Sequence, residues 1–171
     1  MLDFVRENRF PGKRMIRKTF SAILSATFLF ALVGCGAGGG VSEPTIIFGR
    51  EVAHSNGKTV VADTASSFHI NDILNIELRV PDAFLRDKLM LKVYWVEDEN
   101  GKRFGTTENL TRSQTLNGIN PKAQQMVLNN SDKSRTLGKF IGAKAGVYRV
   151  EFHTESYKIA ERELRVYKKG K

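Results

Sequence analysis

Residues 45–171 of this chain are predicted to be mainly β, folded as a sandwich of two sheets behind an N-terminal targeting segment. Apolar and polar residues alternate over many short stretches, which is the period of strands. Turn residues such as Asn-Gly and Pro separate these stretches. No stretch after residue 45 sustains a helical repeat. About seven short strands with turns between them are typical of a two-sheet sandwich.

Residues 1–34 have the layout of a secretory signal peptide, in which basic residues precede an apolar run and small residues follow it. The uncharged apolar run covers about 14 residues, from 20 to 33. That is shorter than the roughly 20 residues that a helix needs to cross a bilayer. The segment is therefore expected to direct export and to be removed. A start at Met15 would also leave a complete signal, so the start is open between Met1 and Met15.

The end of the apolar run, Leu32-Val33-Gly34-Cys35, resembles the lipobox of bacterial lipoproteins. The resemblance implies cleavage between Gly34 and Cys35 by signal peptidase II. It also implies a diacylglycerol on the cysteine thiol and an acyl chain such as palmitate on the new amino group. Glycine lets the peptidase approach the backbone, and the thiol is the nucleophile. The alternative is a leftover free thiol, which is an awkward feature in an exported protein.

Residues 35–44 are expected to form a flexible tether between the lipid and the folded domain, because glycines dominate them. Gly36 follows the cysteine. In Gram-negative lipoproteins an aspartate at this place resembles an inner-membrane retention signal. In an organism that has an outer membrane, its absence favours a location in the cell envelope at that membrane, facing the periplasm.

The expected strands are alternating stretches bounded by turn residues. In order, they cover residues 46–53, 58–63, 74–80, 89–95, 102–106, 147–153 and 158–168. Asn56-Gly57 is the hairpin turn between the first two, and Pro81 ends the third. Residues 108–145 are the least patterned part of the domain. A strand is expected within residues 134–141, and a strand or a short helix at residues 124–128.

Two aromatic residues resemble landmarks of immunoglobulin-like domains. Tyr148, in Ala145-Gly-Val-Tyr-Arg-Val-Glu-Phe152, resembles the tyrosine that opens the penultimate strand of such domains and hydrogen-bonds to the preceding backbone. Trp95 lies midway through an early strand, where such domains keep a core tryptophan. The resemblance implies a two-sheet immunoglobulin-like sandwich, in which both residues support the fold. The cysteine pair of true immunoglobulins is absent.

The charge distribution argues against a nucleic-acid partner. The net charge is +9, but residues 1–34 carry four of these charges, which leaves about +5 for the rest. The remaining acidic and basic residues are interspersed rather than gathered into a basic patch.

No catalytic, cofactor-binding or metal-binding residues are expected. His54, His69 and His153 fall in three different segments without metal-ligand spacing, and no serine lies in a nucleophile elbow. We expect these histidines, Asp72 and Glu97 to lie far from one another, and His153 to point to solvent. Four aromatic residues are expected outside the core, where they could anchor a partner or simply pack at edges and loops. They are Phe84, Phe104, Tyr157 and Tyr167.

The sequence therefore predicts a non-catalytic binding or accessory module of the cell envelope. The lipid on Cys35 would hold it at the membrane, and an edge strand or loop tips would bind a protein or an envelope polymer. The alternative is an envelope enzyme or enzyme inhibitor whose site is assembled from distant residues.

Overall fold

The computed structural model describes residues 41–105, 109–129, 136–142 and 144–168. The signal segment, Gly34 and Cys35 lie outside the described residues. In the described part no helix is long and apolar enough to span a bilayer.

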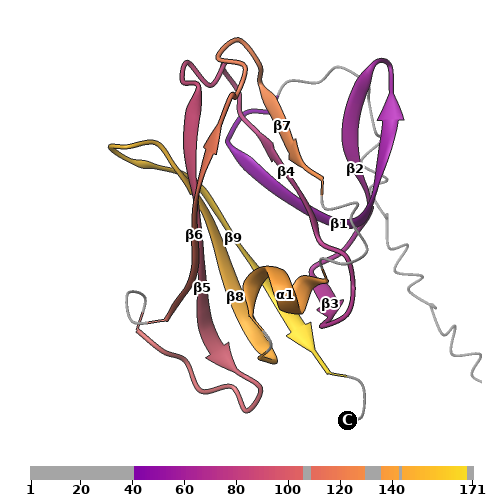
Figure 1. Ribbon diagram of the computed structural model, residues 1–171, viewed down its shortest axis with the longest axis vertical. Coiled ribbons are helices and arrows are strands. Elements are labelled where there is room, and N and C mark those ends of the chain that lie inside the picture. The colour runs from indigo at the N-terminus through magenta and orange to yellow at the C-terminus, as the bar shows by residue number, and fades with distance from the viewer. Residues whose placement is uncertain (1–40, 106–108, 130–135, 143, 169–171) are drawn as a thin grey trace, which may run out of the picture. The chain divides into compact units, whose positions relative to one another are not determined.

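Strands make up most of the described chain. They are β1 (Thr45–Ser55), β2 (Lys58–Thr64), β3 (Ser67–His69), β4 (Asn75–Arg79), β5 (Lys88–Asp98), β6 (Leu110–Asn117), β7 (Gln125–Leu128), β8 (Gly146–His153) and β9 (Lys158–Tyr167), with one short helix, α1 (Leu137–Ile141), before β8. Figure 1 shows the strands as two layers with α1 at one end of the gap between them.

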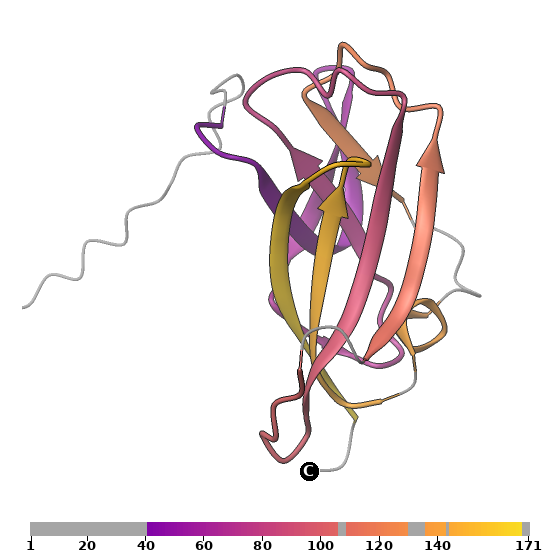
Figure 2. The same cartoon turned by 90° about the vertical axis from the view of Figure 1, so that its left-hand side faces the viewer.

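The strand order identifies the domain as a two-sheet immunoglobulin-like sandwich. One sheet has the order β2-β1-β4-β7 and the other β3-β9-β8-β5-β6 (Figures 1 and 2). Here β4 lies between β1 and β7, and β8 lies between β9 and β5. In immunoglobulin-like domains the second strand lies in the same way between the first and a later one, and the penultimate strand between the last strand and an early one. The predicted fold class is confirmed. Residues 118–124, which join β6 to β7, form a loop, so the strand that such domains add beyond the equivalent of β7 is absent there.

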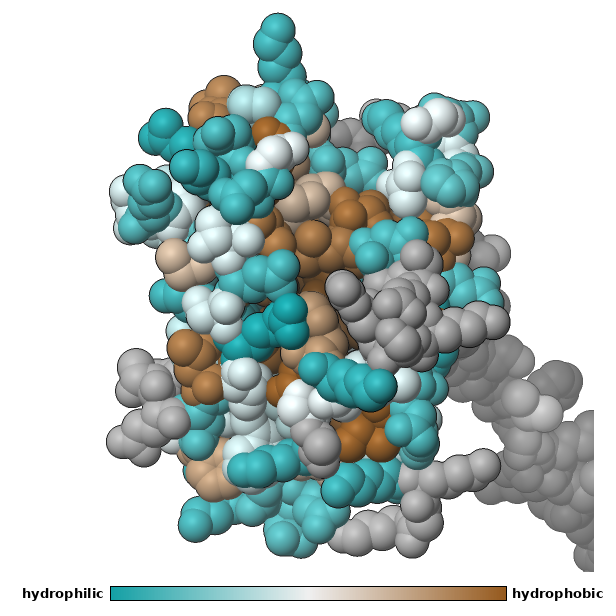
Figure 3. Space-filling view, viewed as in Figure 1, coloured by the Kyte–Doolittle hydropathy of each residue, from teal (hydrophilic) through white to brown (hydrophobic). Residues whose placement is uncertain are grey.

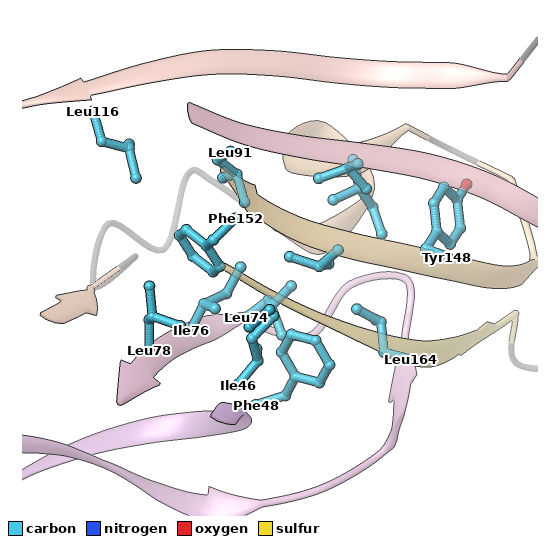
Figure 4. Packing of buried hydrophobic residues seen from close by; sticks show 14 of the residues in the cluster. Ile46, Phe48, Leu74, Ile76, Leu78, Leu91, Leu116, Tyr148, Phe152 and Leu164 are labelled. Atoms are coloured by element: carbon cyan, nitrogen blue, oxygen red, sulfur yellow. The ribbon is translucent and has the colours of Figure 1, made fainter. Parts of the chain in front are cut away.

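The core fills the space between the sheets, as Figure 4 shows. Alternate residues of β4, β5 and β8 point into it because strand side chains alternate between faces. The largest fully buried side chains are those of Tyr148, Phe48, Phe68 and Phe152. Burying an apolar side chain of this size contributes about 1.5 to 3 kcal/mol to folding, so these residues hold the two sheets together.

The β1–β2 hairpin is fixed to the sheet at two places. β1 pairs first with β4 and then with β2, and it changes partner at Gly49. A Cβ at Gly49 would lie 2.2 Å from the Ala62 carbonyl oxygen, so only glycine fits there. The carboxylate of the fully buried Glu77 on β4 accepts hydrogen bonds from the Val61 amide and the Gln125 side chain, both at 2.8 Å. β2 is thereby bound to β4 through a side chain.

The strand expected within residues 134–141 is wrong, since residues 137–141 form α1. Leu137 and Ile141, four residues apart, lie on one helical face, and both are buried. Apolar residues four apart in a single turn do not distinguish a helix from a strand in so short a stretch. The expected strand at residues 102–106 is also wrong, because only a single bridge joins Arg103 to Glu97.

Two strands lie where none was expected. β3 has only three residues and pairs with β9 in parallel. β6 runs beside β5, and its Arg112 and Gln114 share the inward face with the buried residues of β5. Because polar residues occupy these inward positions, the apolar alternation that marks a strand is missing. The strand alternative for residues 124–128 is confirmed as β7.

Candidate binding groove

One side of the sandwich is hollowed between β6 and β7, the outer strands of the two sheets. Two adjoining hollows of about 430 and 440 Å³ lie there and share Gln114, Leu116 and Leu128. We call them together the β6–β7 groove. Each volume is in the range of about 300 to 1,000 Å³ that ligand pockets have.

The floor of the groove is apolar because the sandwich is open on this side. Leu74, Ile76 and Leu116 are core residues that also line the groove. Met126 and Leu128 of β7 pack against the same core and are only half-buried. Figure 3 shows this strip as brown atoms in the middle of the face. The groove therefore offers apolar contacts that no described residue fully covers.

The rim at the α1 end carries positive charge. Arg112 donates to the Phe140 carbonyl at 3.0 Å and to the Gln114 side-chain oxygen at 2.7 Å, and its guanidinium carbon lies 4.4 Å from the centre of the Phe140 ring. Lys139 is exposed beside it. Neither cation forms an ion pair with a described residue, and no described acidic residue lines the groove. This end attracts an anionic group.

The two edge strands differ in how they are protected against pairing with another chain. Proteins usually blunt an edge strand with lysine, proline or an inward-pointing charge. β6 has the inward-pointing Arg112. β7, with the sequence Gln-Met-Val-Leu, has neither a charge nor a proline. Within the described residues β7 pairs only with β4, so no described strand covers its other edge.

Of the predicted site residues, Tyr148 takes the position of an immunoglobulin-like corner. Its ring is fully buried, and its hydroxyl donates a 2.9 Å hydrogen bond to the Lys144 carbonyl. Burial raises the pKa of the hydroxyl above its usual value, because the buried tyrosinate would be poorly solvated.

Trp95 lies near the end of β5 rather than at the centre of the core, and it is half-buried. Its indole nitrogen donates to the Ala145 carbonyl at 3.3 Å. The Phe104 ring centre lies 4.6 Å away, and the Lys144 ammonium lies 4.4 Å from the Trp95 ring. Trp95 thus packs the end of the sandwich where β8 begins.

The three histidines lie in different surroundings. The His54 ring is 3.2 Å from the Thr59 hydroxyl in the β1–β2 hairpin, and the His69 ring packs on that of Tyr167. His153 does not simply point to solvent, since its Nε2 lies 2.8 Å from the buried Glu151 carboxylate. No three metal-ligating side chains converge among the described residues.

The two carboxylates singled out beside the histidines are bound by arginines. Asp72 accepts from Arg50 at 3.1 Å. It also accepts the backbone amide of His69 at 2.8 Å, a contact that belongs to a local turn rather than to an acid–base pair. Glu97 accepts from Arg103 and Arg165, at 3.0 and 3.1 Å. Asp72 and His69 therefore lie side by side, although they were expected to be far apart. Their contact is between the Asp72 carboxylate and the His69 backbone amide.

Of the aromatic residues expected near the surface, Phe84 is only 7% exposed and belongs to the core, so that expectation is wrong. Tyr157 and Tyr167 are exposed, as expected. Phe104 is half-buried against Trp95.

No family model matches the chain, and no curated protein matches it. A similar solved structure is that of an immunoglobulin-like protein from Pseudomonas aeruginosa. It is 14% identical, the alignment covers 75% of this chain and 100% of that chain, and the TM-score is 0.39. The strand order of this chain identifies its fold by itself.

Proposed function

We propose that this protein is a lipid-anchored envelope lipoprotein whose immunoglobulin-like domain binds a partner without catalysis. The observation that carries the binding role is the β6–β7 groove, an apolar strip with a positive rim whose cations form no ion pair with a described residue. Exposed apolar surface that is rimmed by polar residues marks interaction sites. The anchoring role is supported by the lipobox at residues 32–35.

The way the chain enters the domain is compatible with this role. Thr45 pairs with Arg79, so β1 begins at the end of the sandwich where the loop after β4 lies. Figures 1 and 2 show the end of β9 at the opposite end. A tether of residues 35–44 would span at most about 3.5 Å per residue. The entry end would then stay within roughly 35 Å of the lipid, with the groove running along the side.

The anchor is tested by Cys35→Ala. This variant should lose acylation and leave the membrane fraction or remain unprocessed, because stable anchoring needs more than one acyl chain. Intact mass and membrane fractionation measure the result, with Ser42→Ala in the same tether as control. A Cys35→Ala chain with unchanged mass and unchanged membrane association would contradict lipid anchoring.

The binding role is tested by a photo-crosslinking residue placed at Lys139 in living cells, with Lys102 as the control position. Both lysines are exposed, but only Lys139 lines the groove. We expect one defined adduct from position 139 and none from position 102. Equal labelling from both positions, or none from either, would argue against the groove as the binding surface.

A further inference from the structure

We propose that the β6–β7 groove takes an extended, acidic segment of a partner protein, which adds as a strand to the open edge of β7. This inference rests on the proposed binding function and names the chemistry of the partner. The occupant must satisfy three features of the groove: an unpaired strand edge, an apolar floor and a positive end.

The first feature is the backbone. Residues 118–124 leave out the strand that immunoglobulin-like domains place beyond the equivalent of β7. Among the described residues no strand pairs with this edge of β7, and the fold can accommodate another strand there, about 4.8 Å away. An extended peptide can supply the matching hydrogen bonds, as in other complexes that add a strand to a sheet edge.

The second feature is the floor. Met126 and Leu128 pair with Leu78 and Ile76, so they face the core side of the sheet. A strand beside β7 would direct every second side chain over the same floor, towards Leu116 on β6. The incoming segment must therefore have apolar residues at alternate positions. Its other side chains would face away from the core and can be polar.

The third feature is the charge. Arg112 and Lys139 lie at the α1 end, whereas the residues that line the other end, around Gly118 and Ile119, are uncharged. An acidic residue or a terminal carboxylate at the α1 end would pair with both cations. A fatty acid would also satisfy the floor and the charge, but it has no groups to pair with the β7 backbone. The open edge of β7 is what favours a peptide.

Arg112 also explains why β7 rather than β6 is the edge to which the segment adds. Its side chain points inward and is held by Gln114 and the Phe140 carbonyl. An inward charge on an edge strand discourages pairing at that edge. The same guanidinium retains N–H donors for an anion. Arg112 therefore both prevents strand pairing at the edge of β6 and favours an acidic partner at the groove.

The test uses the whole processed chain in lipid nanodiscs and a blocked peptide in which valine and threonine alternate between terminal glutamates. We expect the peptide to bind and to slow hydrogen exchange of the β7 amides at the open edge about tenfold. Lys139→Glu should weaken binding about fivefold, because an attraction worth up to about 1 kcal/mol is lost. The control Lys102→Glu, an exposed lysine outside the groove, should not change the affinity.

Two further probes separate the occupants. The same peptide with lysine at both ends should bind more weakly than the glutamate peptide. Oleate is the probe for a single-chain lipid. If oleate binds and the peptide does not, or if bound peptide leaves β7 exchange unchanged, the inference is wrong. Repeating the measurement on Cys35→Ala isolates the groove from the anchor: peptide binding that persists without lipid supports the inference even where anchoring fails.

Discussion

At the residue scale, the hydroxyl of Tyr148 makes the clearest single contribution to the stability of the fold. Tyr148→Phe keeps the buried ring but leaves the Lys144 carbonyl without its 2.9 Å partner. The expected cost is about 1 kcal/mol, the net contribution of one intramolecular hydrogen bond. Thermal unfolding should show a melting temperature lower by several degrees, while peptide binding at low temperature stays intact. Unchanged stability together with lost binding would move Tyr148 from the scaffold to a binding role.

The pKa of Tyr148 also has a consequence for stability at high pH. In the folded state burial raises the pKa of the hydroxyl above the ordinary tyrosine value of 10.0. The unfolded chain therefore releases this proton at a lower pH than the folded chain does. Stability is fully present below about pH 10 and falls as the pH rises through the folded value. Urea unfolding between pH 8 and 11 should show a steeper decline for the wild type than for Tyr148→Phe.

At the element scale, the β1–β2 hairpin depends on a close approach at Gly49. Gly49→Ala would place its Cβ 2.2 Å from the Ala62 carbonyl oxygen, so β1 and β2 would have to separate. The expected cost is about 1 to 3 kcal/mol, the usual range for overpacking. Gly105→Ala is the matched control, since nothing lies within 4 Å of its Cβ. Denaturant unfolding measures both variants. Equal stability of the two would show that the hairpin bends without strain.

At the scale of the whole molecule, we expect function to follow the groove and not the ionisable residues elsewhere. Alanine at His54, His69 or His153 should leave any phenotype of the gene unchanged, because these side chains lie in separate surroundings. Lys139→Glu should restore the function of the gene less well than the wild type does. Complementation of a deletion strain measures both. A single histidine variant that abolishes function while its melting temperature stays normal would indicate catalysis instead.

The sequence by itself determined the class of the fold and most of its strands. Strands with one buried face alternate between apolar and polar residues, and this local signal was sufficient for β1, β2, β4, β5, β8 and β9. Tyr148 was identified because residues 145–152 resemble an immunoglobulin-like corner, whose hydrogen bond spans only four residues. The lipobox is also local, and it remains a prediction.

Only the tertiary structure revealed the β6–β7 groove. Arg112 and Lys139 are separated in the chain by β7 and meet because β6 and α1 pack on the same side of the sandwich. β6 lacks apolar alternation because its inward face lines the groove instead of the closed core. The groove exists because residues 118–124 form a loop where immunoglobulin-like domains have a further strand. Burial of Glu77 similarly depends on β2 returning over β4. The local pattern of apolar and polar residues indicates which face of a segment is buried. A binding surface, in contrast, arises where distant segments pack in a way that leaves an apolar face exposed.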